Sequence, residues 1–431
     1  MRPPARLQAA VDVLTEVLAG NRPAAVALAD WGRAHRFAGS GDRAVIGNLV
    51  YDALRRKASA ACLMGAQTPR ALMIGTLQLA WNEDLNAIAA LTDGSRHAPA
   101  ALSQIECAAL GRGLPADAPD HVRGDFPAWL TPSLERAFGS ATVSQMQALS
   151  VRAPLDLRTN TLRATRDQVL AVLAPHGATA TLLSPLGVRI APSGHNGRTP
   201  NVEVLDAHAR GWYEVQDEAS QIAALLTGVR PGMAVADVCA GAGGKTLAMA
   251  ARMDNGGALH AYDLSSARLR PIHARLKRAG ATIVSVLDAG RTDQLAALAG
   301  QLDLVLVDAP CTGSGVWRRM PETKWWLTRA ELEQRQAEQV IVLDIAAPLV
   351  GRGGRLVYAT CSILPEENVD QIAAFIARHP DFTVIPTATA WARAIGGPAP
   401  SSADGRTDTL QLTPRTHGTD GFFVAVLERQ A

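Results

Sequence analysis

The first 80 residues carry apolar side chains at the spacing of amphipathic helices. Leucine, valine and alanine recur every three or four positions within 7–18 and within 46–54, and this spacing places them on one face of a helix. A third helix is predicted over 69–81, because Pro69 stands at its start, where a missing backbone N–H costs little. The pattern therefore predicts a helical N-terminal domain.

The helical spacing of apolar residues is lost after about residue 92, and a pattern of strands and a helix follows from residue 154. Between about 92 and 128 the sequence is rich in Gly, Pro, Ala and Asp, which indicates a linker or a frayed domain edge. The segment 154–177 predicts a strand followed by a capped helix, and 186–192 predicts a second strand. A polar loop, 193–201, closes this small α+β unit.

From about residue 206, short apolar runs alternate with helix-like segments. The runs are rich in β-branched residues, and this alternation predicts a parallel sheet covered by helices on both faces. A last run, 421–428, is predicted to close the edge of the sheet. The other predicted strands are 233–238, 257–262, 282–287, 302–308 and 354–359.

The length of 431 residues is too great for one ordinary core. We therefore expect three parts: a helical domain at 1–125, a small α+β segment at 126–205, and an α/β domain at 206–431.

Composition narrows the class of protein. Hydrophobic residues make up 48% and charged residues 19%, which suits a compact soluble protein, and no stretch is long and apolar enough to span a bilayer. The net charge of +2 means that any contacts with nucleic acid must be concentrated in patches. Five cysteines without a CxxC pair argue against a disulfide framework and against a structural metal site. We expect a cytoplasmic protein without a metal.

A glycine-rich turn, DVCAGAGGKT (237–246), follows the first strand of the α/β domain. Such a turn lets the backbone approach a ligand at the start of the next helix. A P-loop would need glycine where Cys239 stands, and a dinucleotide fingerprint that began at Gly241 would need glycine in place of Thr246. The turn therefore predicts a cofactor site of another kind.

Two acidic residues suggest which cofactor this is. Asp263 ends the second strand, where a carboxylate can bind both hydroxyls of a ribose, and Asp288 follows the third strand, within reach of an adenine edge. This arrangement suits S-adenosylmethionine. The alternative is that the turn only packs the helix against the strand.

Two cysteines follow the next two strands, Cys311 the fourth and Cys361 the fifth. Ligands of an open parallel sheet lie beyond the carboxyl ends of the strands, where the strand order reverses. Both thiols can therefore reach the pocket beside the loop 239–245. Cys62 and Cys107 are expected to be small buried hydrophobes.

Paired thiols beside a methyl donor suit chemistry on a cytosine ring. Addition of a thiolate to C6, with an acid at N3, makes C5 able to attack an activated methyl group. A base must then remove the C5 proton, and the thiol must leave. The sequence offers Cys311, Cys361, Asp308 and Lys245 for these tasks.

Several motifs together resemble the Sun/nucleolar-protein family of RNA (cytosine-5) methyltransferases, most closely its bacterial ribosomal branch. The resemblance covers essentially the whole chain. It implies a class I S-adenosylmethionine-dependent methyltransferase with a Rossmann-like, mostly parallel sheet, preceded by an all-α NusB-like RNA-binding domain and a small α+β segment that contacts RNA. The motifs are DVCAGAGGKT (237–246), DAPCTGSGVWRRMPETKWW (308–326), YATCSILPEEN (358–368) and HGTDGFF (417–423).

The resemblance also implies roles for single residues. Cys361 of the TCS motif would be the nucleophile, and Cys311 of the PC motif would assist product release, with Asp308 and Lys245 beside them. The usual turn reads CAAPGGKT, so this turn lacks a proline and should be less rigid. The implied cofactor contacts are Cys239, Ala240, Gly241, Ala242, Gly243, Gly244, Lys245, Asp263, Arg268, Asp288 and Asp308.

Basic and aromatic residues follow Cys311. Arg318, Arg319 and Lys324 alternate with tryptophans, a pattern that suits phosphate contact and base stacking on RNA. Arg158 resembles part of the family's auxiliary segment, which lies against the RNA. The alternative is that Trp325, Trp326 or both cap a core.

The resemblance implies methylation of cytosine C5 in ribosomal RNA of the small subunit, by a monomer. The same chemistry on tRNA is an alternative, because the catalytic motifs are shared. A catalytically idle RNA-binding assembly factor is another, although retention of Cys311, Cys361, Asp308 and Lys245 together argues against it.

Overall fold

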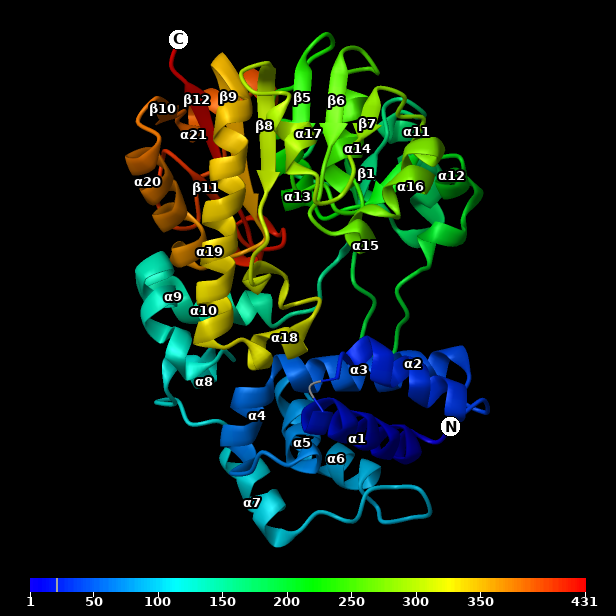
Figure 1. Cartoon of the computed structure of the whole chain (residues 1–431). Helices are drawn as coiled ribbons and strands as arrows, with labels where there is room; N and C mark the ends of the chain where they lie inside the picture. The colour runs from blue at the N-terminus through cyan, green and yellow to red at the C-terminus, as the bar shows by residue number, and fades with distance from the viewer. Residues whose placement is uncertain (21) are drawn as a thin grey trace. The chain divides into compact units, whose positions relative to one another are not determined.

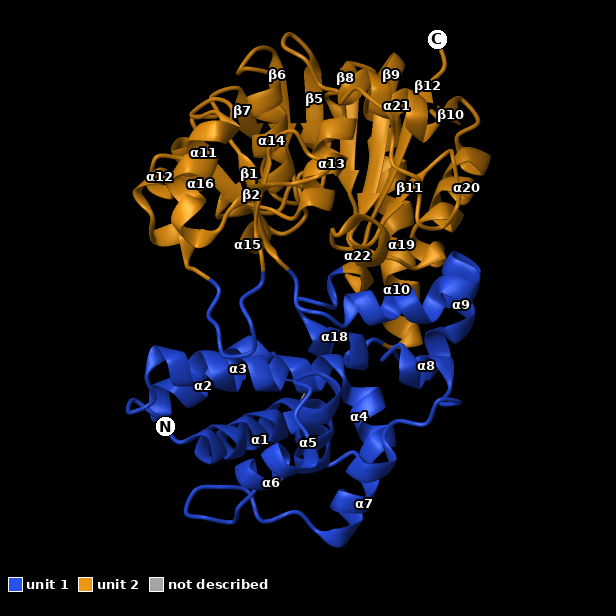
Figure 2. Cartoon of the chain, turned by 180° about the vertical axis from the view of Figure 1, so that it is seen from behind, with its two compact units in different colours: residues 1–153, 192–199, 316–327 blue, residues 154–191, 200–315, 328–431 orange. Residues whose placement is uncertain are grey.

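The computed structural model describes residues 1–20 and 22–431. Its contacts divide the chain into two compact units, which we call unit 1 and unit 2 (Figure 2). Unit 1 comprises 1–153, 192–199 and 316–327, and unit 2 comprises the remainder, 154–191, 200–315 and 328–431. The three-part division expected from the sequence stays a prediction.

Unit 1 is built from helices, and the apolar faces of those within 3–112 form one core. The three helices predicted from the apolar spacing are present as α1, α3 and α5, and Trp326 packs against the same core. The helices are α1 (Pro3–Gly20), α2 (Ala24–Ala34), α3 (Ser40–Arg55), α4 (Lys57–Met64), α5 (Pro69–Leu79), α6 (Leu85–Leu91), α7 (Gln104–Arg112), α8 (Asp120–Arg123), α9 (Thr131–Phe138), α10 (Thr142–Leu149) and α18 (Pro321–Trp326).

The linker expected between 92 and 128 is partly wrong. Helix α7 lies inside this range, and a capping box begins it: the Ser103 hydroxyl accepts from the backbone N–H of Glu106, whose carboxylate accepts from the N–H of Ser103. Ala109 and Leu110 are buried in the core of unit 1. Only two buried residues anchor the helix, so its apolar pattern is weak in the sequence.

Unit 2 contains two sheets. The smaller one is antiparallel, in the order β2-β3-β1-β4; β1 and β3 are the strands predicted within 154–177 and 186–192, whereas β4 lies beyond the predicted segment 126–205. The larger one has the order β10-β12-β9-β8-β5-β6-β7, with β11 paired to β12. The strands are β1 (Leu155–Thr159), β2 (Thr179–Ala180), β3 (Gly187–Ile190), β4 (Tyr213–Val215), β5 (Ala234–Asp237), β6 (Ala258–Ala261), β7 (Val284–Val286), β8 (Leu302–Asp308), β9 (Val350–Thr360), β10 (Phe382–Val384), β11 (Leu410–Leu412) and β12 (Phe422–Arg429).

Helices cover both faces of the larger sheet, as predicted. Alternate residues of the strands enter two separate cores, one with α13 and α21 and the other with α19 and α20, and α19 lies on the near side of the sheet in Figure 1. The helices of unit 2 are α11 (Arg166–Leu173), α12 (Asp206–Ala209), α13 (Glu218–Leu226), α14 (Gly244–Arg252), α15 (Ser266–Leu269), α16 (Ile272–Ala279), α17 (Thr292–Ala296), α19 (Arg329–Ala346), α20 (Val369–Arg378), α21 (Thr387–Ala394) and α22 (Pro414–His417).

The strand order determines which loops lie together at the edge of the sheet. Strands β5 to β9 are parallel, and the order reverses between β5 and β8, so the loops after these two strands leave the same edge of the sheet. The prediction that the last strand closes the sheet was wrong. Strand β12 lies between β9 and β10, because the short strand 382–384, which the sequence analysis did not single out, pairs antiparallel with its outer side.

Two absences apply to the described part of the chain. No helix in it is long and apolar enough to cross a membrane. Residues 1–20 and 22–431 also contain no cluster of three or more His, Cys, Asp or Glu side chains that could hold a metal ion.

Candidate active site

The loop between β5 and α14 depends on glycine at two positions. Gly241 and Gly243 have φ angles of +50° and +83°, in the left-handed region that other residues rarely adopt. A Cβ atom on Gly243 would lie 2.6 Å from the side chain of Ile272 in α16. The glycines therefore allow the tight turn and the close packing of α16 against it.

Asp263 organises this loop from the end of β6. Its Oδ2 accepts a hydrogen bond from the backbone N–H of Gly241 at 3.0 Å, and its Oδ1 accepts from the N–H of Ser265 at 2.9 Å. Its side chain is almost fully buried. A pocket opens beside the carboxylate, lined by Val238, Cys239, Tyr262, Asp263, Leu264, Arg268, Pro310, Val342 and Ile345.

Asp263, which lines this pocket, lies where the sequence predicted contacts with the ribose of the cofactor. Each oxygen of the Asp263 carboxylate accepts one backbone N–H, which leaves further acceptor sites for ribose hydroxyls. Leu264, Val342 and Ile345 offer apolar walls for an adenine ring. Burial raises the pKa of the Cys239 thiol, so this cysteine lines the pocket as a neutral group.

The remaining predicted cofactor contacts differ in placement. The guanidinium of Arg268 lies 3.8 Å from the Asp263 carboxylate, at the pocket. Asp288 is exposed, exchanges hydrogen bonds with Gln294, and is not among the residues that line the pocket.

Two arginines support the loop from outside the motif. Arg275 of α16 donates to the carbonyl of Ala242 at 2.8 Å, and its guanidinium is also bonded to Glu214. Arg158 of β1 donates to the side-chain oxygen of Gln216 at 2.7 Å. A second, longer bond of 3.4 Å joins Arg158 to the carbonyl of Gly244.

Lys245 and Asp308 meet where the strand order reverses. The Lys245 ammonium lies 2.6 Å from Oδ2 of Asp308 and 4.8 Å from the centre of the Phe422 ring. The neighbouring Asp237 is fully buried and accepts a hydrogen bond from the Thr246 hydroxyl. Burial raises the pKa of Asp237 to about 7.

The two predicted catalytic thiols are in contact. The sulfur of Cys311 lies 3.4 Å from the sulfur of Cys361, and both cysteines are free and half-buried. The hydrogen bond with Cys361, together with burial, raises the pKa of the Cys311 thiol well above its ordinary value. Cys62 is exposed and Cys107 is half-buried, so the prediction that both are buried was wrong.

Backbone contacts hold the two thiol loops together. The N–H of Gly315 donates to the carbonyl of Cys361, and the N–H of Gly421 donates to the carbonyl of Gly315. The hydroxyls of Ser314 and Ser362 lie 2.9 Å apart. A Cβ atom on Gly315 would lie 1.9 Å from the carbonyl oxygen of Gly421, so no side chain fits at this position.

The buried carboxylate of Glu367 also connects the two thiol loops. It accepts from the N–H of Thr312 at 2.8 Å, from the hydroxyls of Thr312 and Ser362, and from the amide of Gln339 at 3.0 Å. Burial raises the pKa of this carboxyl, although the hydrogen bonds act in the opposite direction. Glu367 therefore joins the loop after Cys311 to the loop after Cys361.

The sequence analysis did not single out Glu367, Arg275 or Glu214. A signal for Glu367 is present in SILPEEN, where a proline and two acids follow an apolar run directly after the TCS motif. No comparable local signal marks Arg275, because its partner at position 242 lies 33 residues away in the sequence.

The residues predicted to bind RNA are mostly buried. Arg158, Arg318 and Lys324 are 1%, 4% and 1% exposed, and only Arg319 is half-buried. The Lys324 ammonium faces the carbonyl of Arg55 within unit 1, and burial lowers its pKa to about 7. This placement does not support phosphate contacts by the three buried side chains, because a phosphate needs an accessible cation.

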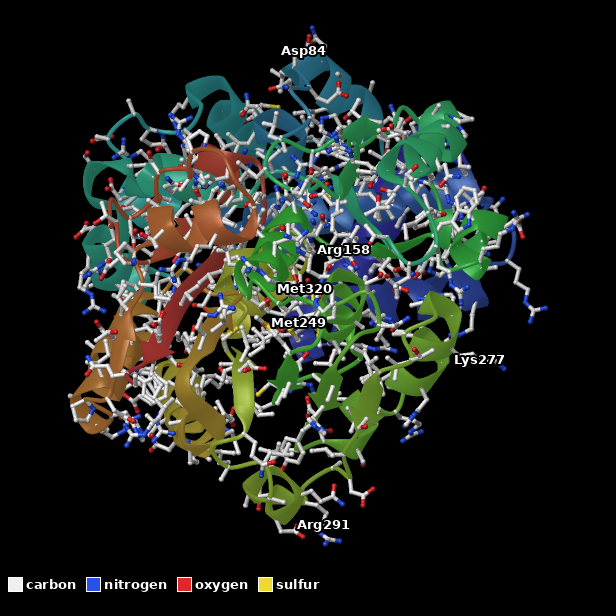
Figure 3. All side chains as sticks on the ribbon, turned by 90° about the horizontal axis from the view of Figure 1, so that it is seen from above. Asp84, Arg158, Met249, Lys277, Arg291 and Met320 are labelled. Carbon is white, nitrogen blue, oxygen red and sulfur yellow. The ribbon has the colours of Figure 1, made fainter. Side chains whose placement is uncertain are left out.

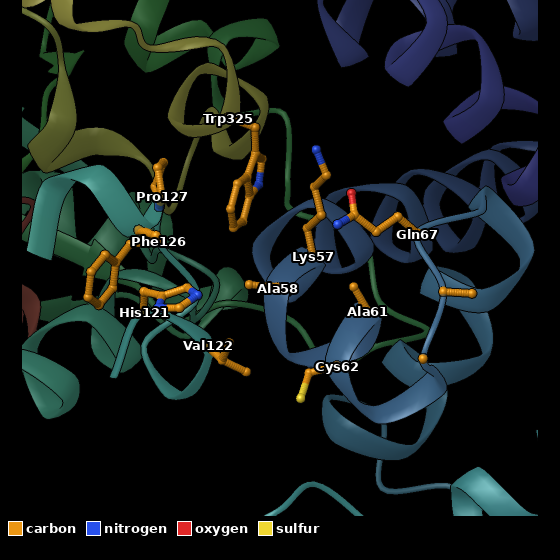
Figure 4. Close-up of a pocket in the computed structure, with 13 residues that line it drawn as sticks. Lys57, Ala58, Ala61, Cys62, Gln67, His121, Val122, Phe126, Pro127 and Trp325 are labelled. Atoms are coloured by element: carbon orange, nitrogen blue, oxygen red, sulfur yellow. The ribbon is translucent and has the colours of Figure 1, made fainter. Parts of the chain in front are cut away.

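A surface hollow of about 600 Å³ lies in unit 1 between α4 and the segment around α8 (Figure 4). Trp325 stands at its edge, where its indole N–H donates to the carbonyl of Leu54 and the Lys57 ammonium lies 5.2 Å from the centre of its ring. Gln67 and His121 also line this hollow. Trp325 is thus half-exposed, in contrast to Trp317, which is fully buried.

Comparison with protein families gives two matches. The family described as 16S rRNA methyltransferase RsmB/F matches residues 224–428, and the ferredoxin-like domain of RsmF/B-like methyltransferases matches residues 126–194.

Individual proteins are similar over nearly the whole chain. A probable ribosomal RNA small subunit methyltransferase B from Synechocystis is 31% identical, covering 90% of this chain and 91% of the relative. A ribosomal RNA small subunit methyltransferase B from Sodalis glossinidius is 33% identical, with 90% of each chain covered.

Among solved structures, the protein PH0851 is 25% identical with a TM-score of 0.75, covering 100% of this chain and 99% of that one. A methyltransferase homologue from Pyrococcus horikoshii shares the fold, with a TM-score of 0.59 at 24% identity, covering 72% of this chain and 97% of that one.

Proposed function

Since the chain belongs to the RsmB/F family of ribosomal RNA methyltransferases, we propose that it methylates C5 of a cytosine in small-subunit ribosomal RNA through a covalent bond between Cys361 and C6 of the base. Family membership confirms the predicted family, the class I methyltransferase fold, the enzyme class and S-adenosylmethionine as cofactor. The target atom, the covalent step and the residue roles belong to the proposal.

One observation carries the proposal: the 3.4 Å contact between the sulfurs of Cys311 and Cys361, on loops that leave the same edge of the sheet as the cofactor loop. The hydrogen bond with the Cys361 sulfur, together with burial, raises the pKa of the Cys311 thiol, so the Cys311 sulfur holds a proton firmly. The assignment of Cys361 as the nucleophile and of Cys311 as the group that assists release rests on the TCS and PC motifs.

The proposed steps use the groups that the fold brings together. Bound S-adenosylmethionine supplies an electrophilic methyl group for C5. The Cys361 sulfur adds to C6, and a proton shared across the 2.6 Å contact between Lys245 and Asp308 is available for N3. After C5 has been methylated, the Cys311 sulfur, in its thiolate form, takes the C5 proton, and the electrons of the C5–H bond re-form the C5–C6 double bond. The Cys361 sulfur leaves as a thiolate, and N3 returns its proton.

The roles of the thiols can be tested by exchanging each for a hydroxyl. Cys361→Ser should abolish methylation and any covalent protein–RNA adduct, because a hydroxyl is a far weaker nucleophile than a thiolate. Cys311→Ser should allow addition but hinder elimination, so that an adduct survives in denaturing gels. Cys62→Ser, at an exposed cysteine of unit 1, is the matched control. An adduct trapped by Cys361→Ser, with Cys311→Ser inert, would reverse the assignment.

The RNA class needs a separate measurement. Bisulfite sequencing of ribosomal and transfer RNA from a strain that lacks this protein should show the loss of one 5-methylcytosine in small-subunit ribosomal RNA. Loss of a 5-methylcytosine from a transfer RNA would instead show that the substrate is that transfer RNA. We further propose that the enzyme acts as a monomer in the cytoplasm, which sedimentation and fractionation can check.

A further inference from the structure

Four cations lie near one another in unit 1, two of them buried and two partly exposed. They are Arg55, Arg56, Arg152 and Lys324, and they come from three parts of the chain that are distant in sequence. Arg55 and Arg56 stand at the end of α3, and Arg152 follows α10. None of these side chains is used in the chemistry proposed above.

Two carboxylates pair with these cations. Asp52 accepts from Arg55 at 2.8 Å, from Nε of Arg152 at 3.2 Å, and from the indole of Trp81 at 3.0 Å. Asp125 lies 3.5 Å from Arg56 and also attracts Lys324. The carboxylates are 6% and 0% exposed, so they have little capacity for further cations.

A cavity of about 390 Å³ opens beside this cluster. Its lining residues include Asp52, Arg56, Asn82, Ser150, Arg152, Ser193 and His195. Most of their side chains carry hydrogen-bond donors, and the one carboxylate among them, Asp52, is already bonded to two arginines. Asp84, in the acidic pair that follows Asn82, is not among the lining residues and points outward at the edge of the molecule (Figure 3).

One donor beside the cavity lacks a partner in the described part of the chain: the Nε of Arg56 is buried and makes no hydrogen bond there. Nδ1 of His195 lies 3.3 Å from the Arg152 guanidinium and 3.7 Å from the Asp52 carboxylate. Stacking on Trp81, with ring centres 4.7 Å apart, fixes the imidazole in place.

The arrangement suits an anion with several oxygens. The two arginines that line the cavity, Arg56 and Arg152, are each paired with one carboxylate, and both side chains stay partly exposed, so they are accessible to an anion. A phosphate would accept from a guanidinium, an imidazole and a hydroxyl at once. Leu79, Ala80, Val151 and Pro192 also line the cavity, so the donors occupy one part of its wall, which suits a phosphate.

We propose that this cavity binds a phosphate of the RNA backbone and anchors the substrate to unit 1. This inference rests on the proposed function for the identity of the RNA, whereas the recognition of phosphate rests on the cavity alone. The anchor lies outside the segment 318–324, where the sequence predicted basic contacts. It would fix the position of the RNA without reading its sequence, as phosphate contacts do.

Asn82→Asp is the sharpest test. Asn82 is exposed at the rim of the cavity and has a φ angle of +55°, a conformation that aspartate tolerates as well as asparagine. The variant adds a negative charge there without disturbing the core. Gln67→Glu is the matched control, because it makes the same change at an exposed residue of the hollow beside Trp325, within the same unit. Arg56→Gln removes a cation of the cavity directly.

Binding of a small-subunit ribosomal RNA fragment to the full chain is measured by filter binding over a series of salt concentrations. Asn82→Asp and Arg56→Gln should raise Kd about tenfold, and Arg56→Gln should reduce the slope of log K against log salt by about 0.7 to 0.9. Gln67→Glu should leave both unchanged. Equal affinity of all variants would overturn the proposal.

Inorganic phosphate distinguishes the two sources of the anion. If phosphate raises the melting temperature of the wild type at constant ionic strength and not that of Asn82→Asp, while RNA affinity is equal, the cavity binds a free anion and the RNA anchor is wrong. Methylation separates this proposal from the function: the cavity variants should raise KM for RNA and keep kcat. A wild type that forms no 5-methylcytosine would instead refute the function.

Discussion

Thr312 donates two hydrogen bonds to Glu367, one from its backbone N–H and one from its hydroxyl. Thr312 directly follows Cys311, and Glu367 lies six positions after Cys361. A single buried carboxylate therefore holds the two thiol loops in register. The sulfur–sulfur contact depends on this link as much as on the cysteines themselves.

Glu367→Gln should lower kcat about 10- to 100-fold without unfolding the protein. The amide keeps one oxygen as an acceptor. Its nitrogen, which replaces the other oxygen, cannot accept from the hydroxyls of Thr312 and Ser362, so the thiols lose their fixed separation. The hydrogen bonds of the Glu367 carboxylate go to Thr312, Ser362 and Gln339 and not to the cofactor loop. The affinity for S-adenosylmethionine, measured by calorimetry, should therefore be unchanged. A parallel loss of cofactor affinity would show a wider structural role.

Arg275→Met should weaken S-adenosylmethionine binding about 5- to 20-fold. The charge-assisted bond to the carbonyl of Ala242 stabilises a turn that lacks the proline of the usual motif, and such a bond contributes roughly 1.5 kcal/mol. Arg278→Met is the control, because Arg278 binds Glu214 in the same way but does not touch the loop. Equal effects of the two variants in calorimetry would assign the loss to Glu214 and not to the turn.

Asp263→Ala should weaken cofactor binding by about 1–3 kcal/mol, because ribose hydroxyls lose a charged acceptor and Gly241 loses the partner of its N–H. Ser265→Ala offers a comparison, since its backbone N–H still binds the carboxylate. Titration calorimetry with unchanged affinity would remove Asp263 from the cofactor site.

Asp237→Asn should change how stability depends on pH. The folded pKa of Asp237 is about 7, above the ordinary value of 3.8, so the folded state binds the extra proton in this window. The stabilisation is fully present below about pH 4 and is lost as pH rises through 7. Relative to the variant, the wild type should lose up to about 1.4 kcal/mol per pH unit in the window. If the difference in unfolding free energy between the wild type and the variant is the same at pH 5 and at pH 8, the prediction is wrong.

The sequence predicted the architecture of unit 2 well because its signals are local. A buried parallel strand needs a continuous apolar run, and a tight cofactor turn needs glycine where φ is positive, as at Gly243. The strand 382–384 was missed, because three residues do not make a pattern. Its pairing with β12 also explains why the predicted sheet edge was wrong.

The site was predictable only where a residue type reveals its chemistry. Cysteines after two adjacent strands predict a pair, and the sulfurs do meet. The residue type does not predict whether a cation is exposed. Lys324 and Arg158 belong to basic or polar stretches, yet both are buried. Each donates a hydrogen bond to a residue distant in sequence, Lys324 to Arg55 and Arg158 to Gln216. Tertiary contacts decide between a surface charge and a buried one.

The backbone contact between Gly315 and Gly421 has a consequence for the evolution of this site. Neither position has room for even a methyl group, since each would place it within 2.6 Å of the other backbone or closer. A relative that keeps both cysteines but has lost either glycine could not hold its thiols at this separation. Loss of either glycine would therefore disrupt the paired thiols while the cysteine motifs still looked intact.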